Sequence, residues 1–263
     1  NQRVLDRRMV AFSVNVTGSS TRNKLVTLGE GVTPILTGNR STQKNTTGYP
    51  LFGMWGRTYT INDRNGDGIV AAPSGTVGTA NYDPGDLILN PGDTTVYLGN
   101  TYPKLEMAVS PTLELFDRKL RFNAQFDTRL GFQKLNNTLR HQCSTGSQSC
   151  RGANDPTAPL EVQAASVALN NYGTILTGFY RDMNFTRFRE LSAAFQMPDR
   201  WARALRANRW NVVLTGRNLA LWDGGYDGVD PETTVGNSDA RGNEEYFSTP
   251  PLRTFTFRMN FTF

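Results

Sequence analysis

Oxygen-bearing side chains recur at short spacing in residues 63–69, Asp-Arg-Asn-Gly-Asp-Gly-Ile. Three of them stand at the first, third and fifth positions, as the ligands of calcium loops do, with glycine at the sixth: Asp63, Asn65 and Asp67. The twelfth position is Ser74, so the bidentate acid of an EF-hand is missing, although Asp83 or Asp86 could supply a further oxygen. The spacing indicates calcium as a ligand, and a metal-free turn of Asn, Gly and Asp explains it equally well.

A second acidic stretch, residues 223–232, places carboxylates among glycine and proline: Asp223, Asp227, Asp230 and Glu232. Paired carboxylates about 5 to 9 Å apart perform acid and base catalysis in glycosidases. Acids in a loop without an apolar pocket to raise one pKa are more often solvated or structural. We therefore expect no catalysis from this stretch and no enzymatic activity from the chain.

The chain has a single histidine, His141, in a polar stretch without partners at triad or metal spacing, and we interpret it as a solvated loop residue. Cys143 and Cys150 flank six small or polar residues. A disulfide between them would close a short loop and suit an oxidising compartment outside the cytoplasm. Two free loop thiols are the alternative.

Composition excludes several classes of protein. The 263 residues are 38% hydrophobic and 11% aromatic, which is too apolar for a disordered chain. No segment approaches the roughly 20 apolar residues of a transmembrane helix. The 28 basic residues outnumber the 23 acidic ones, but they are scattered singly, so we expect no nucleic-acid partner.

Apolar and polar residues alternate along several segments, which predicts β-strands. Residues 105–115 and 120–132 flank a tight turn at 117–119 and indicate a long hairpin. The remaining segments with this alternation are residues 10–16, 183–195, 210–214 and 255–263.

Strand length and loop asymmetry favour one all-β architecture. The strands run for about ten residues or more, where soluble strands average five or six. Short turns near residues 116–119 and Pro198 contrast with long polar connections at 60–103, 134–180 and 222–251. We predict an antiparallel transmembrane β-barrel of outer-membrane type, with long external loops and short periplasmic turns. A soluble sandwich with one wet face is the alternative.

The last strand is the most specific local feature. Five apolar residues, four of them Phe, share one parity up to the end of the sequence: Phe255, Phe257, Met259, Phe261 and Phe263. This resembles the C-terminal signal by which outer-membrane barrels are recognised for assembly. An edge strand packed on a soluble core is the alternative, and it would leave an aromatic edge prone to aggregation.

Several motifs, in order, resemble the C-terminal portion of SusC/RagA-type TonB-linked outer-membrane receptors. The matching pieces are residues 48–53 (Gly-Tyr-Pro-Leu-Phe-Gly), 63–69, 97–100 (Tyr-Leu-Gly-Asn) with Pro103, 185–192, 214–219, 228–232 (Gly-Val-Asp-Pro-Glu) and 250–263. Each motif is weak alone, and together they cover nearly the whole chain.

The resemblance implies a large barrel, closed by an N-terminal plug, in the outer membrane of a Gram-negative bacterium. It implies uptake of oligosaccharide or peptide nutrients, energised by TonB, with a SusD-like lipoprotein and outer-membrane lipid as partners. About 22 strands of about ten residues need roughly 220 residues, and residues 60–103 alone use 44. We therefore expect residues 1–263 to be the C-terminal part of a receptor barrel, without a plug domain, or a truncated relative that closes with partner chains.

Five polar residues are candidates for the lumen wall: Asn123, Gln125, Arg187, Arg189 and Arg217. The two arginines at 187 and 189 share parity with the apolar residues of their strand, which conflicts with a lumen position. Two other functions remain open: a non-transporting barrel or scaffold unit of a surface assembly, and a secreted carbohydrate-binding β-sandwich.

Overall fold

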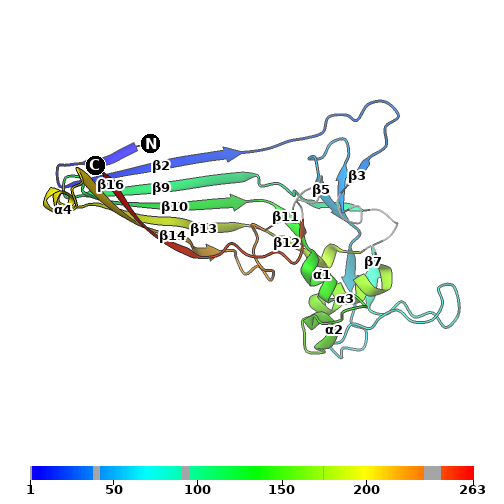
Figure 1. The fold of residues 1–263 in the computed structure, drawn as a ribbon. Coiled ribbons are helices and arrows are strands. Elements are labelled where there is room, and N and C mark those ends of the chain that lie inside the picture. Colours follow the sequence, from blue (N-terminus) through cyan, green and yellow to red (C-terminus); the bar gives the residue numbers. More distant parts are fainter. Residues whose placement is uncertain (1, 38–41, 91–94, 174, 234–243) are drawn as a thin grey trace.

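The main unit is an open, seven-stranded antiparallel sheet (Figure 1). The computed structural model describes residues 2–37, 42–90, 95–173, 175–233 and 244–263. In spatial order the strands are β1 (Gln2–Asp6), β2 (Val10–Ser20), β9 (Leu105–Leu115), β10 (Leu120–Leu130), β13 (Phe185–Gln196), β14 (Arg209–Trp222) and β16 (Thr254–Thr262). The predicted strands and the β9–β10 hairpin are confirmed, and β1 is an additional edge strand.

Cross-strand register gives this sheet one apolar and one polar face. Phe122 of β10 lies opposite Leu113 on one side and Ala193 on the other, while Leu214 of β14 lies opposite Phe257. The polar face carries three cross-strand ion pairs: Arg121 with Glu114, Arg129 with Glu106, and Arg217 with Glu190. The period-two pattern of the sequence therefore continues across the whole sheet, because paired residues share a face.

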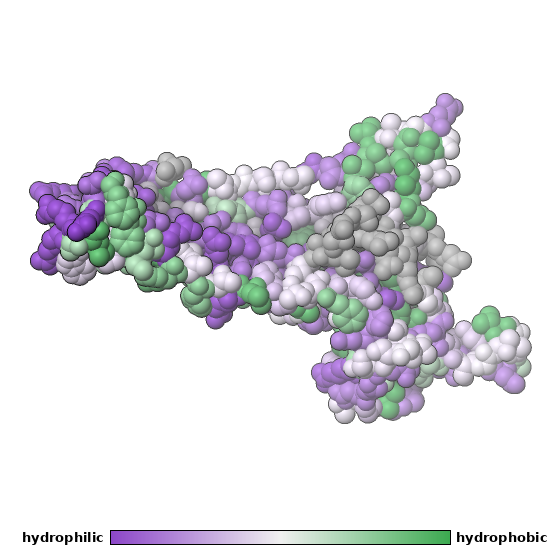
Figure 2. Space-filling model, viewed as in Figure 1, coloured by the Kyte–Doolittle hydropathy of each residue, from purple (hydrophilic) through white to green (hydrophobic). Residues whose placement is uncertain are grey.

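Within the described residues, no second protein layer covers the apolar face. Phe255 is 75% exposed and Phe257 is 58% exposed, and neither belongs to a buried cluster. Figure 2 shows hydrophobic residues in a band along the path of β16 and hydrophilic residues over the middle of the sheet. A sheet normally buries one face against another element, so this one presents an unusually large apolar surface.

Short connections gather at one end of the sheet, as predicted. The β9–β10 turn holds Phe116, Asp117 and Arg118 at positive φ. The β13–β14 connection contains α4 (Asp199–Ala204), which agrees with the one or two helical turns expected after Pro198. Figure 1 places α4 and both labelled chain ends at this end, opposite the helices α1 to α3.

The long connections are not plain polar loops, and this corrects the expectation from sequence. They form a folded cap at the other end of the sheet (Figure 1). Its strands are β3 (Ile35–Thr37), β4 (Gln43–Asn45), β5 (Gly53–Gly56), β6 (Tyr59–Ile61), β7 (Leu87–Leu89), β8 (Val96–Gly99), β11 (Gln133–Asn136), β12 (Tyr180–Asp182) and β15 (Glu244–Glu245). Its helices are α1 (Asn137–Gln142), α2 (Arg151–Asn154), α3 (Leu160–Tyr172) and the 3-10 turn η2 (Thr177–Phe179). Residues 91–94, 174 and 234–243 of the predicted loops lie outside the described residues.

The larger buried apolar clusters of the described chain lie in this cap. Helix α3 contributes Ala165 and Leu169 to one cluster and Ala164 and Ala168 to another. Small side chains let the helix approach its neighbours closely. α3, the longest described helix, has 13 residues, and none of the described helices has the length and apolarity needed to cross a membrane.

Cys143 and Cys150 form a disulfide that joins the end of α1 to the start of α2, and both are buried. In the double variant Cys143→Ser/Cys150→Ser, we expect the free energy of local unfolding of this loop to fall by about 2–3 kcal/mol. The reason is that the disulfide reduces the conformational entropy of the unfolded loop. Protease cleavage within residues 143–150 should then accelerate about 30-fold or more.

The matched control is Ser147→Ala, an exposed change within the same loop. Equal cleavage rates for the double variant and the unchanged protein would contradict a stabilising role for the bridge.

Candidate functional site

A β-bulge at Arg189 changes which face the preceding residues of β13 occupy. Gln125 pairs with Glu190, but the next residue of β10, Phe126, pairs with Phe188, so Arg189 is the extra residue. Arg187 consequently lies opposite Asp127, on the polar face. The parity conflict in the sequence thus disappears, because a bulge reverses the alternation on one side of it.

Both arginines then hold the acidic stretch 223–232 against the polar face. The Arg187 guanidinium lies 2.6 Å from Asp230, and each side chain is only 4% exposed. Arg187 also lies 3.1 Å from Glu232. Arg189 pairs with Glu232 at 2.8 Å and with Asp127. The two carboxylates are therefore partners in a charge cluster that ties this stretch to the sheet.

Two further cations complete the attachment of this stretch. Lys134 Nζ donates to the backbone carbonyls of Pro231 at 3.0 Å and Thr233 at 3.2 Å. Burial, with a smaller effect from Arg129, lowers the pKa of Lys134 to about 8. Arg181 donates to both carboxylate oxygens of Asp227 at 2.9 Å. The acids of this stretch act as structural anchors in the observed arrangement.

We expect Arg187→Met to destabilise the protein by about 3–5 kcal/mol, since it leaves the Asp230 carboxylate buried without its partner. Arg217→Met is the matched control, because the Arg217 side chain is 63% exposed in its pair with Glu190. The control should lose less than about 1 kcal/mol. Urea unfolding in detergent measures both, and similar losses would contradict the anchoring role of Arg187.

The calcium-like loop is closed by hydrogen bonds. Asp63 accepts from the backbone N–H groups of Gly66 at 2.8 Å and Gly68 at 3.0 Å. Asp67 accepts from Asn65 Nδ2 and from the backbone N–H of Ile69, each at 2.8 Å. The described residues contain no group of three or more His, Cys, Asp or Glu side chains placed to hold a metal. Calcium at this loop stays a prediction.

The two acids that could have completed a calcium site have another partner. Arg64 donates to Asp83 at 2.8 Å and to Asp86 at 3.3 Å. A backbone hydrogen bond from Ala71 and the Arg64 contact lower the pKa of Asp86. Gln163 of α3 accepts from Val70 N–H and donates to Gly68 O, so the helix holds the end of this loop.

The other predicted residues fall in separate places. His141 is exposed, as predicted, but it lies in α1 and not in a loop. Its ring centroid is 5.4 Å from that of Phe247 and 6.0 Å from that of Tyr246. Asn123 and Gln125 lie on the polar face, as their register with Ser192 and Glu190 requires. Of the proposed assembly signal, Phe255, Phe257, Met259 and Phe261 share the apolar face. Phe263 follows the end of β16 and is 79% exposed. The role of these residues in assembly stays a prediction.

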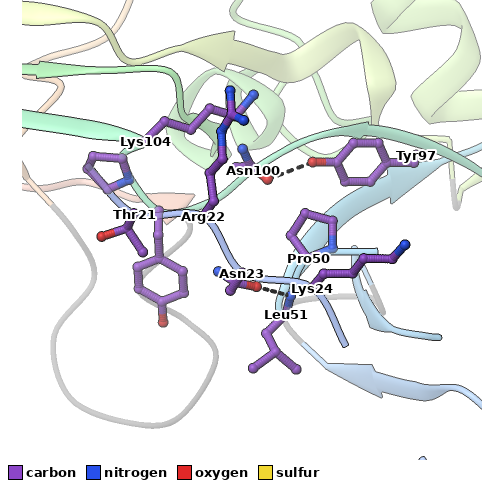
Figure 3. Close-up of a pocket in the computed structure, with 11 residues that line it drawn as sticks. Thr21, Arg22, Asn23, Lys24, Pro50, Leu51, Tyr97, Asn100 and Lys104 are labelled. Carbon is purple, nitrogen blue, oxygen red and sulfur yellow. Dashed lines mark hydrogen bonds between the residues drawn. The ribbon is translucent and has the colours of Figure 1, made fainter. Parts of the chain in front are cut away.

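One cavity lies where the sheet meets the cap, and Figure 3 shows it. Its volume is about 470 Å³, which is within the usual range of small-ligand sites. It is lined by Thr21, Arg22, Asn23, Lys24, Pro50, Leu51, Tyr97, Asn100, Tyr102, Pro103 and Lys104. Arg22, Asn100 and Lys104 lie toward one side in Figure 3, and Pro50 and Leu51 lie toward the other.

Sequence reasoning did not identify these basic residues. Three of the quoted motifs, at 48–53, 97–100 and Pro103, contribute to the lining, but Arg22, Lys24 and Lys104 stand singly in the sequence. They meet because Thr21 N–H donates to Lys104 O at 3.0 Å, which extends the β2–β9 pairing past the strand ends. Only pairing across more than 80 residues of sequence brings them together.

A second cavity, of about 960 Å³, lies within the cap among α1, α2, α3 and β6. Its apolar lining includes Phe179 and Val162, and its charged lining includes Arg181 and Asp227, which pair with each other.

The comparisons with known proteins bear on the fold. No family model and no curated protein matches this sequence. A chain of the RagAB peptide importer in the 'closed-closed' state aligns over 99% of this chain with a TM-score of 0.67 and 14% identity. Chains of the RagAB peptide transporter and of the importer in the 'open-open' state give TM-scores of 0.68 and 0.67, at 15% and 14% identity and the same 99% coverage.

This chain spans about 28% of the length of those chains. At such identities the likeness concerns the fold alone. The fold is SusC/RagA-like, consisting of a long antiparallel sheet with a folded cap at one end.

Proposed function

We propose that this chain is a wall sector of a TonB-dependent outer-membrane receptor that takes up oligosaccharide or peptide nutrients. One observation carries the proposal: the seven-stranded sheet has a continuous apolar face with no described protein layer over it and a polar face with cross-strand ion pairs. Lipid outside and a polar lumen inside satisfy both faces of such a sheet.

The likeness to chains of a peptide importer supports a transport role. Those chains are more than three times as long as this one, so the proposal includes the rest of the barrel, a plug and a TonB-contacting segment in the complete receptor. It also includes a SusD-like lipoprotein partner and the outer membrane of a Gram-negative bacterium as the location. The contribution of this sector is recognition and gating, without enzymatic catalysis.

The test compares two variants of β16, one with a positive charge added on the apolar face and one with the same charge added on the polar face. In the complete native polypeptide, Phe257→Arg should greatly reduce the amount of folded receptor in the outer-membrane fraction. A cation at the centre of the lipid-facing surface costs about 2–4 kcal/mol. The readout is heat-modifiable migration of the barrel in electrophoresis, together with uptake of labelled peptides and oligosaccharides.

The matched control is Thr256→Arg, one residue away on the polar face. It should assemble normally, because a lumen-facing charge remains hydrated. Equal tolerance of both substitutions, or a protein that is soluble without detergent, would contradict the proposal and support a secreted carbohydrate-binding sandwich. Normal assembly without uptake would instead support the scaffold function.

A further inference from the structure

The cavity in Figure 3 is lined by cations that have no partner among the described residues. Arg22, Lys24 and Lys104 all line it, and none of them forms an ion pair with any described residue. Several arginines elsewhere at this end of the sheet are paired, such as Arg129 with Glu106 at 3.2 Å. None of the described residues that line the cavity is Asp or Glu. The cavity therefore concentrates positive charge that nothing in the described chain neutralises.

The amide acceptors of the cavity are already used within the protein. Asn23 Oδ1 accepts from Leu51 N–H at 2.7 Å, and Asn100 Oδ1 accepts from the Tyr97 hydroxyl at 2.6 Å. Burial raises the pKa of Tyr97, which keeps this hydroxyl protonated as a donor. Each amide has its Nδ2 group left to donate. The groups that remain for a ligand are mainly donors and cations.

Backbone hydrogen bonds in the sheet and in the cap hold the walls of the cavity in place. Thr21 N–H donates to Lys104 O at 3.0 Å, and Lys104 N–H donates to Leu130 O at 2.9 Å. On the other side, Leu25 and Tyr49 are joined by a backbone hydrogen bond of 2.9 Å. Arg22 and Lys24 therefore project from a segment fixed at both ends, which reduces the ordering cost of binding.

We propose that this cavity binds a carboxylate group of the transported ligand and so selects acidic oligomers. This inference specifies the substrate class of the proposed transporter, and it rests on that proposed function. Arg22 supplies a planar fork that matches a carboxylate, and the two lysines supply point charges. The carboxylate is the anionic group that an acidic oligopeptide and a uronic-acid oligosaccharide share, and binding assays separate these two sources.

The experiment measures dissociation constants of the complete receptor in detergent by calorimetry. The acidic probes are N-acetylated, C-terminally amidated tetraglutamate and trigalacturonate, and their neutral counterparts are tetraglutamine blocked in the same way and the methyl ester of trigalacturonate. We expect the acidic probes to bind and the neutral ones to bind at least tenfold more weakly. Binding should weaken as salt is raised, because the three cations are solvent-accessible.

The pocket variant combines Arg22→Gln, Lys24→Gln and Lys104→Gln. Each exposed cation should raise the affinity for the acidic probes about two- to fivefold. Removing all three should therefore raise the dissociation constant about 10- to 100-fold. The control combines Arg7→Gln, Lys119→Gln and Arg203→Gln, which removes the same charge at the opposite end of the sheet. The control should change the constant less than twofold.

Each outcome has a definite meaning. Loss of binding of both acidic probes in the pocket variant supports the shared carboxylate, and binding of only one acidic probe supports the site and identifies its source. The inference is overturned if no acidic probe binds, if neutral probes bind equally, or if the pocket variant and the control behave alike. Assembly in the outer membrane and uptake of neutral oligomers would persist in those cases, so the proposed function would survive.

Discussion

The rest of this structure depends on one constraint: the seven-stranded sheet has an apolar face, and none of the described residues forms a layer over it. Seven strands align their apolar residues through cross-strand pairs such as Leu214 with Phe257. The opposite face is polar and carries ion pairs between neighbouring strands. None of the described residues forms a core over the apolar face, and the larger apolar clusters of the described chain lie in the cap. The sheet is stable where an apolar medium meets one face and water meets the other.

The junction between sheet and cap is held on one side by charge. The bulge at Arg189 lets Arg187 and Arg189 leave the apolar face and reach Asp230 and Glu232. Buried guanidinium groups need anionic partners, so the acidic stretch and the arginine strand depend on each other. These ion pairs join the two sequence motifs at 185–192 and 228–232 in the fold.

The other side of the same junction has the opposite character. There Arg22, Lys24 and Lys104 line a cavity without acidic partners among the described residues. One side thus satisfies its cations within the protein and stabilises the fold, while the other leaves them for a ligand. The calcium-like loop resembles the side that stabilises the fold, because its polar groups also have partners within the protein. Arg64 pairs with Asp83, and Gln163 accepts from Val70 N–H.

The sequence by itself determined the long strands, their two faces, the short turns at one end and α4. These depend on local alternation and turn residues, which act over a few neighbours. The sequence also pointed to the resemblance that the fold comparison supports. It did not determine the cap helices, because α3 is stabilised by packing of Ala164 and Ala168 against distant strands. Only the tertiary structure decided the face of Arg187 and the meeting of Arg22 with Lys104, because a bulge and a long-range strand pairing depend on partners far away in the chain.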